Sequence, residues 1–139
     1  MFWNTQQQLE DLICQLVSWD SRTGTEGERH FPFKLKDELA KLDYYKAHPD
    51  HIALHDAGRE RNALTALYRH DDAKKTIVLM SHFDTVHTKE FGSKSHLAFT
   101  PRELGNRFKE IADDFSPDNK WDALSGEYLY GRGTMDMKM

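Results

Sequence analysis

Apolar residues recur at helical spacing in the first part of the chain. One run predicts an amphipathic helix from about residue 5 to residue 18, ending in the turn-rich segment 20–24. A second run predicts a helix over about 33–42, with Pro32 in its first turn, where a missing N–H costs nothing. The residues that form the first apolar stripe are Leu9, Leu12, Ile13, Leu16 and Val17.

The middle of the chain predicts three short strands. Polar and apolar residues alternate over 51–55 and again over 63–68, after a break at 48–50. A polar turn over 69–75 then leads into Thr-Ile-Val-Leu-Met at 76–80, an uninterrupted apolar run that predicts a strand buried on both faces.

A further helix is predicted over about 100–111. Thr100 and Glu103 have the spacing of a capping box, and Pro101 stands at the first helical position. Residues 113–119 predict a loop, and a short apolar segment follows at 128–130. The alternation of helices and strands predicts the α/β class.

Composition narrows the function classes. The 139 residues carry a net charge of −4 with scattered basic residues, which argues against nucleic-acid binding. No apolar run is long enough for a membrane helix, and the first residues do not form a signal peptide. The single cysteine, Cys14, excludes an intrachain disulfide, indicates a reducing, cytoplasmic location and is expected to be an unreactive, partly packed thiol. The 30% share of charged residues, above the usual ~25%, indicates a soluble chain with a small core, as in a piece of a larger domain.

Two segments carry candidate chemistry. Ser-His-Phe-Asp-Thr-Val at 81–86 follows the apolar run, and His82 and Asp84 point to the same side of an extended backbone. An imidazole suits zinc, and a nearby carboxylate can hold its other ring nitrogen. A His-x-Asp spacing by itself more often marks a polar strand end with a satisfied histidine. In Tyr-Gly-Arg-Gly-Thr-Met-Asp-Met-Lys at 130–138, the glycines permit a tight path and Asp136, between methionines, is expected to be buried beside a partner or a metal. A helix cap or turn is the other interpretation of Asp136.

Taken together, the two segments resemble the motifs of the M20 metallopeptidase family, which includes aminoacylases, carboxypeptidases and dipeptidases. The resemblance extends to the first predicted helix, the loop at 21–28 and the strands before residue 81. It implies a zinc-peptidase catalytic domain with a mixed sheet flanked by helices. The loop at 25–28 and the long stretch between the motifs are similar to the branch associated with arginine utilisation or degradation.

The resemblance also implies residue roles. His82 would bind one zinc, Asp84 would hold His82 in place as part of the catalytic machinery, and Asp136 would bridge two zincs about 3.5–4 Å apart. Cobalt or manganese are alternatives to zinc. The substrate would be a small peptide or an N-acyl amino acid, a cis peptide would follow Asp136, and full-length relatives are often homodimers.

The chain departs from this family at several positions. Ser81 replaces a usual glycine, His87 a frequent proline and Met139 a frequent glycine; His87 is expected to be a solvated loop residue. The family's general-base glutamate, its later metal ligands and its lid domain do not occur in residues 1–139. We therefore interpret 1–139 as the N-terminal portion of one catalytic domain, inactive alone, with a non-catalytic binding module as the alternative.

Other clusters have simpler interpretations. A group of three histidines could share a helix face and bind a metal, but the proline beside them and the strand pattern favour surface positions. A group of three arginines could form a basic patch, although exposed positions on a loop and at a strand end are the simpler interpretation. Four aromatic residues are expected to pack and not to stack on a ligand, and two serines lack the histidine and aspartate partners of a serine hydrolase. These residues are His48, His51 and His55; Arg59, Arg61 and Arg69; Phe31, Phe33, Tyr44 and Tyr45; Ser18 and Ser21.

Overall fold

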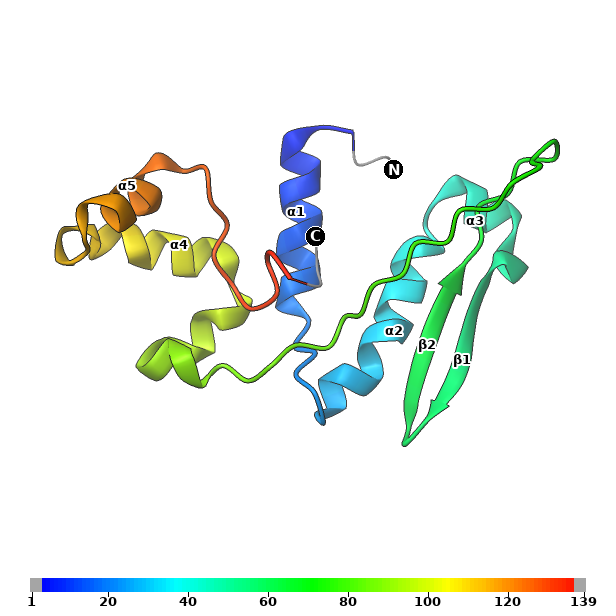
Figure 1. The fold of residues 1–139 in the computed structure, drawn as a ribbon, viewed down its shortest axis with the longest axis horizontal. Coiled ribbons are helices and arrows are strands. Elements are labelled where there is room, and N and C mark those ends of the chain that lie inside the picture. The colour runs from blue at the N-terminus through cyan, green and yellow to red at the C-terminus, as the bar shows by residue number, and fades with distance from the viewer. Residues whose placement is uncertain (1–3, 137–139) are drawn as a thin grey trace.

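The computed structural model describes residues 4–136 and shows an elongated molecule (Figure 1). Helix α1 (Gln6–Ser18) stands in the middle. Helices α2 (Glu26–Leu39) and α3 (Asp43–Ala47) and a hairpin of β1 (Ile52–Gly58) and β2 (Arg61–Ala66) lie on one side. Helices α4 (Pro101–Glu110) and α5 (Pro117–Ser125) lie on the other. The α/β class is confirmed, although the sheet in this part of the chain is an antiparallel pair and not a mixed sheet.

The first helix begins where the sequence predicts. The Thr5 hydroxyl accepts a hydrogen bond from the backbone N–H of Gln8 at 3.3 Å, and the Gln8 side chain accepts one from the Thr5 N–H at 3.3 Å. This reciprocal pair is a capping box, which satisfies two N–H groups that have no partner within the helix. Val17, on the apolar stripe, is fully buried.

Helix α2 begins well before the predicted position. Thr25 caps it by accepting from the Glu28 N–H, and Glu26 and Glu28 place negative charge at its positive end. Pro32 therefore lies inside the helix and not in its first turn, and its buried ring packs in the core. The prediction was wrong because the capping signal at Thr25 outweighs the helix-breaking tendency of a proline.

The short elements that follow confirm the break at 48–50. Helix α3 was not predicted, and a 3₁₀ turn, Pro49–His51, leads from it into the hairpin. Strands β1 and β2 pair in antiparallel register, with Leu54 opposite Leu64. Arg59 and Glu60 form the turn with positive φ angles of 54° and 60°, the combination that matches the twist of a hairpin. The first two predicted strands are therefore confirmed with shifted ends.

A charged pair ties α2 to the hairpin. Glu28 is 6% exposed, and its carboxylate contacts Arg61 through Nε at 2.8 Å and Nη2 at 3.2 Å. The same carboxylate accepts a hydrogen bond from the Gly24 N–H at 2.5 Å. A buried carboxylate needs such partners, because an isolated charge in the interior is costly.

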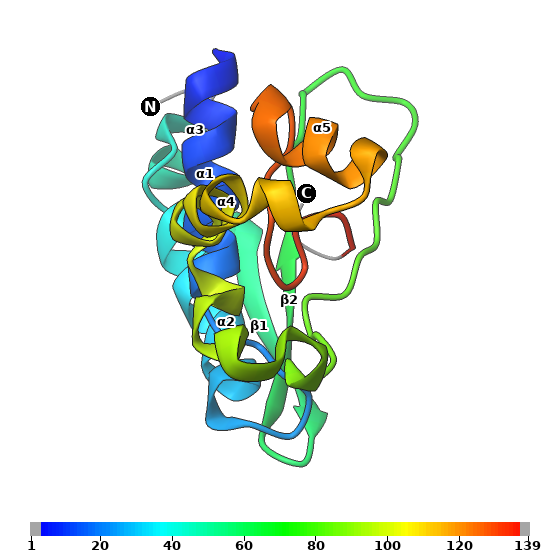
Figure 2. The ribbon, with the colours of Figure 1, turned by 90° about the vertical axis from the view of Figure 1, so that its left-hand side faces the viewer.

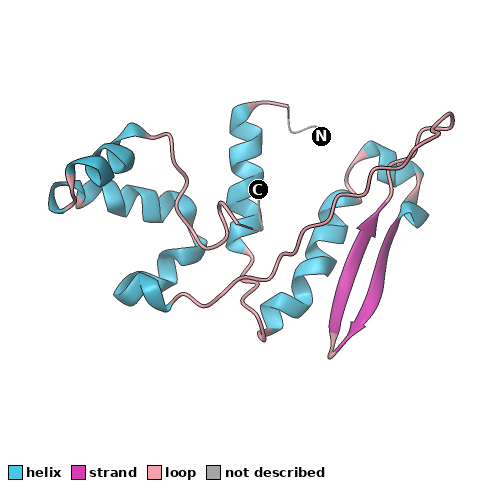
Figure 3. Cartoon of the chain, in the orientation of Figure 1, coloured by secondary structure: helices cyan, strands magenta, loops and turns pink. Residues whose placement is uncertain are grey.

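The prediction of a buried strand at 76–80 is wrong for this structure. Residues 67–84 run as an extended loop after β2, seen in green in Figures 1 and 2 and as loop in Figure 3. Ile77, Val78, Leu79 and Met80 are 84%, 74%, 91% and 91% exposed. Within residues 4–136, the one sheet is the β1–β2 hairpin, so no neighbouring strand supplies the backbone partners that a sheet requires.

The total solvent-accessible surface also indicates that the chain leaves much of its surface uncovered. The solvent-accessible surface is 10028 Å² for a mass of 16.2 kDa. A compact monomer of that mass exposes about 7,500 Å². The fold therefore leaves uncovered a surface that compact domains of this size bury, and the apolar loop at 77–80 is part of it.

The part of the chain from residue 89 to residue 125, which we call the helical lobe, is more helical than predicted. Helix α4 begins after Thr100 as expected, with Pro101 at its start, but the Thr100 side chain does not cap it and donates instead to the Leu97 carbonyl at 3.2 Å. A 3₁₀ segment, Lys89–Phe99, precedes α4. The predicted loop at 113–119 overlaps another 3₁₀ turn, Ala112–Asp114, and the start of α5. Across residues 4–136, no helix has the length and apolar character needed to cross a membrane.

The exposed apolar loop makes the first testable prediction. Replacing Leu79 with lysine is expected to lower the binding of the dye ANS and the self-association of the 139-residue chain, because exposed apolar segments bind both. Dye fluorescence and light scattering measure the two effects. Leu9→Lys is the control, since Leu9 is a 47% exposed residue on α1; an equal effect of both changes would contradict the role of the loop.

Candidate metal half-site

The candidate site begins with two distant segments joined by backbone hydrogen bonds. The Thr85 N–H donates to the Ser21 carbonyl at 3.0 Å, and the Thr23 N–H donates to the Thr85 carbonyl at 2.9 Å. The buried Ser21 hydroxyl donates to the Phe83 carbonyl at 2.6 Å. These bonds form a short parallel bridge that fixes residues 83–85 against the loop between α1 and α2.

Packing under this bridge holds the same segments together. The Phe83 ring stacks on the buried Phe31 ring of α2, with centroids 4.8 Å apart and planes 10° from parallel. Gly27 brings the first turn of α2 against the loop, because a Cβ at this position would lie 1.9 Å from the Asp20 carbonyl oxygen. The loop at 20–25 is therefore fixed by α2 on one side and by residues 83–85 on the other.

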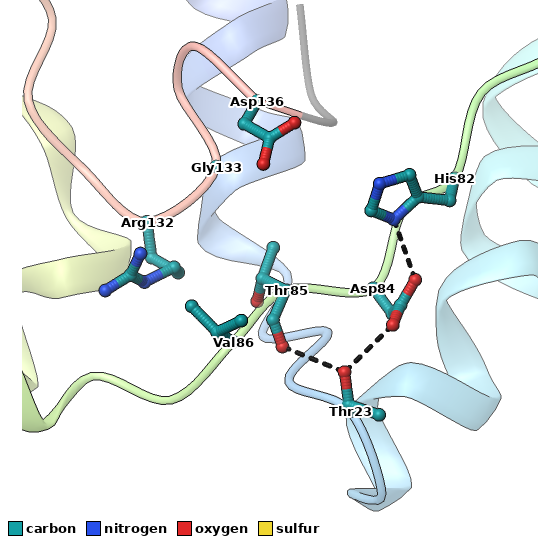
Figure 4. Close-up of a pocket in the computed structure, with 8 residues that line it drawn as sticks. All are labelled: Thr23, His82, Asp84, Thr85, Val86, Arg132, Gly133 and Asp136. Atoms are coloured by element: carbon teal, nitrogen blue, oxygen red, sulfur yellow. Dashed lines mark hydrogen bonds and ion pairs between the residues drawn. The ribbon is translucent and has the colours of Figure 1, made fainter.

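His82 and Asp84 form the central pair of the site. The His82 Nδ1 lies 2.9 Å from one Asp84 oxygen, and the Thr23 hydroxyl donates to the other at 2.9 Å (Figure 4). With Nδ1 protonated toward the carboxylate, Nε2 presents its lone pair, which is the arrangement found in histidines that bind metals. The contact predicted from the His-x-Asp spacing is thus present, although the segment is a loop and not the end of a strand.

The surroundings of Asp84 favour its charged form. Burial alone would raise the pKa of Asp84, but the hydrogen bonds from His82 and Thr23 outweigh it and hold the pKa below the usual value for aspartate. Asp84 therefore remains a carboxylate at neutral pH and can orient the imidazole.

Asp136 reaches the site from a tight loop at 131–136. Gly131 packs so closely that a Cβ there would lie 3.0 Å from the Val17 side chain and 3.2 Å from the Ala98 carbonyl oxygen, and the Arg132 N–H donates to that carbonyl at 2.7 Å. Gly133 has a φ of 86°, a conformation that favours glycine. The tight path inferred from the two glycines is confirmed.

The environment of Asp136 differs from the prediction. Asp136 is exposed and not buried, and the neighbouring Met135 is 84% exposed, because the loop carries both residues outward past Gly133. The peptide after Asp136, where a cis bond is expected, lies outside the described residues.

A single pocket collects the three candidate residues. Its cavity volume is about 110 Å³. In Figure 4 the Asp136 carboxylate faces the opening from one side and the His82–Asp84 pair lies on the other. The pocket is lined by Thr23, His82, Asp84, Thr85, Val86, Arg132, Gly133 and Asp136.

The donor set fits part of a zinc site. An imidazole with a free Nε2 and a carboxylate that share a pocket are suitable zinc ligands, but a catalytic zinc has three protein ligands. Among residues 4–136, no group of three or more histidine, cysteine, aspartate or glutamate side chains could hold a metal ion. The described residues therefore offer two ligands and one orienting carboxylate, and we derive no catalytic step from them.

Three further residues shape the pocket and were not singled out from the sequence. Thr23 bonds Asp84, Thr85 buries a hydroxyl that has no partner in the described structure, and Arg132 forms an ion pair with Glu90. Nothing local in the sequence marks Thr23 or Thr85, because their roles arise only when segments far apart in the chain meet. Glu90 also contacts the exposed His87 at 3.1 Å, so His87 is a loop residue as predicted.

The three histidines and Phe31 have structural partners. His48 and His51 stack with centroids 5.0 Å apart beside Tyr44, whereas His55 bonds Thr65 within the hairpin, so the three histidines do not converge. Phe31 is buried, as the packing interpretation requires.

Cys14 is a partly buried thiol on α1. Burial raises the pKa of Cys14, partly offset by nearby Arg102, a neighbour that the sequence did not indicate. The raised pKa agrees with the prediction of an unreactive thiol.

Two curated proteins of Bacillus subtilis (strain 168) are similar to this chain along nearly all of its length. The uncharacterized protein YqjN is 40% identical over 142 residues, which cover 99% of the chain, and protein RocB is 30% identical over 139 residues, which cover 97%. The chain spans about a quarter of each, 25% of YqjN and 24% of RocB. No family model matches the chain, and no solved structure matches it.

Proposed function

We propose that this chain supplies part of the active site of a metal-dependent hydrolase that cleaves amide or peptide bonds in small amino-acid derivatives. One observation carries the proposal: His82, Asp84 and Asp136, from two segments far apart in the chain, line one pocket. The resemblance of these segments to the M20 motifs supports the same roles.

In this proposal His82 binds zinc through Nε2, and Asp84 holds the imidazole by accepting from Nδ1–H. Asp136 would supply a carboxylate ligand from the other side of the same pocket. When bound, zinc polarises a carbonyl and lowers the pKa of a bound water toward about 7. Because two protein ligands fall short of a complete site, the chain alone is expected to release no amino acid from dipeptides or N-acyl amino acids.

The finer parts of the proposal concern the whole protein. They are a dinuclear zinc centre, a small peptide or N-acyl amino-acid substrate, the branch associated with arginine utilisation or degradation, a cytoplasmic location and a homodimer. Similarity to YqjN and RocB along 99% and 97% of this chain supports the view that the segment recurs within longer proteins.

Zinc binding tests the site directly. The chain is expected to bind zinc with release of protons at mildly acidic pH, where imidazole must lose its proton to become a ligand. Asp84→Asn is expected to weaken binding about 10–100-fold, because the partner of a metal-binding histidine fixes its orientation. Titration calorimetry gives the affinity, and the NMR signals of the His82 ring show whether zinc reaches that residue.

His87→Ala is the matched control, because His87 is an exposed histidine that pairs with a carboxylate outside the pocket. Equal loss of zinc in the His87 and Asp84 variants would contradict the proposal. Absence of any zinc-induced change at His82 would favour the alternative, a non-catalytic binding module.

A further inference from the structure

A second cavity lies in the helical lobe, apart from the candidate metal half-site. Its volume is about 260 Å³, and it opens between α4, α5 and the segment that precedes Gly131. We call it the aromatic pocket. It is lined by Phe108, Phe115, Asn119, Asp122, Ala123 and Tyr130.

Three aromatic rings form most of its wall. The Phe108 ring meets the Phe115 ring at 75° with centroids 5.9 Å apart, and meets the Tyr130 ring at 84° with centroids 4.9 Å apart. Perpendicular rings of this kind present both faces and edges to a shared space. A ring face attracts a cation that lies within about 6 Å of its centroid.

The polar groups of the pocket lack partners. The Tyr130 hydroxyl is buried and has no hydrogen-bond partner in residues 4–136. The structure gives the Asp122 carboxylate no hydrogen bond or ion pair within the same residues, and the Lys120 ammonium on the same helix pairs with Asp113 instead. The pocket therefore combines one uncompensated negative charge with a buried oxygen that no protein donor satisfies.

The electrostatics of Tyr130 agree with this arrangement. Burial, and then the nearby Asp122 and Tyr128, raise the pKa of the Tyr130 phenol above its usual value. The hydroxyl is therefore neutral at physiological pH and its oxygen can accept a hydrogen bond.

We propose that the aromatic pocket binds the head group of a small organic cation, a guanidinium or an alkylammonium. The cation pairs with the Asp122 carboxylate, donates an N–H to the Tyr130 oxygen and lies against the rings of Phe108 and Phe115. Its apolar stem follows the aromatic wall, and the cavity volume limits the occupant to a small molecule or the end of a longer side chain. The proposal uses none of the residues of the metal half-site and is independent of the proposed function.

Ethylguanidinium and N-ethylurea test the role of charge, because they are planar molecules of similar shape and only the first is charged. Titration of the 139-residue chain, followed by amide NMR at Tyr130 and the Asn119 side chain, measures both affinities. Ethylguanidinium is expected to bind in the millimolar range, at up to about 10 mM, and the urea at least about tenfold more weakly. Equal affinities, or no shift at either residue with ethylguanidinium, would overturn the proposal.

Matched variants locate the binding. Asp122→Asn is expected to weaken ethylguanidinium binding about tenfold or more, and Asp118→Asn, an exposed aspartate on the same helix, is expected to leave it unchanged. Tyr130→Phe is expected to weaken binding relative to Tyr128→Phe, which removes a more exposed hydroxyl. Equal losses within either pair would assign the effect to general charge or packing and reject the pocket as the site.

Discussion

Leu104→Ala is expected to lower the free energy of unfolding by about 2–5 kcal/mol, the largest effect of any single substitution that we derive. Leu104 is 1% exposed on α4, the helix that packs against α1 and the 3₁₀ segment 89–99. Truncation removes buried methyl groups and leaves a cavity that a small core cannot readily close. Urea unfolding followed by circular dichroism measures the change.

Leu124→Ala is the control for this prediction. Leu124 is 52% exposed on α5, so the same truncation there removes little buried surface. The expected change is below about 1 kcal/mol. If both variants unfolded at the same urea concentration, the packing described for α4 would be wrong.

Arg61→Ala is expected to cost about 3 kcal/mol, because it leaves the Glu28 carboxylate buried without its cation. The loss would weaken the contact between α2 and the hairpin, which the Arg29–Glu60 ion pair also joins. Thermal unfolding at neutral pH measures it.

The double variant Glu28→Gln, Arg61→Ala separates lost charge from lost packing. Glutamine keeps the oxygen that accepts from Gly24 but removes the uncompensated charge, so part of the stability is expected to return. Arg69→Ala, on an exposed residue, serves as the control with little change expected. A double variant less stable than Arg61→Ala would show that the buried charge is not the cause.

Elements determined by neighbouring residues could be predicted from the sequence. The helix after Thr5 depends on contacts within a few positions, and the hairpin strands pair across one short turn, so their patterns are sufficient. The buried strand at 76–80 could not be obtained in this way, because burial of a strand depends on neighbours that residues 4–136 do not provide. Helix α2 begins earlier than the predicted residue 33, because the Thr25 cap starts the helix and Pro32 is accommodated inside it.

Some contacts of the candidate site could also be predicted from the sequence, and others could not. The His82–Asp84 contact follows from a two-residue spacing, which places both side chains on one side of an extended backbone. The presence of Asp136 in the same pocket agrees with the motif resemblance, but its exposure does not follow from its apolar neighbours. Thr23 joins the site only through a bridge between distant segments, and a local sequence pattern cannot predict such a bridge.

The bridge between residues 21–23 and 83–85 has a consequence for the order in which the chain folds. It links positions 62 residues apart, whereas the helices and the β1–β2 hairpin close short loops. Long closures cost more chain entropy, and contacts between distant positions slow the search for the native state. We expect helices and hairpin to form first and the bridge afterwards. The His82–Asp84 pair would then reach its native position late, on a scaffold that has already formed around it.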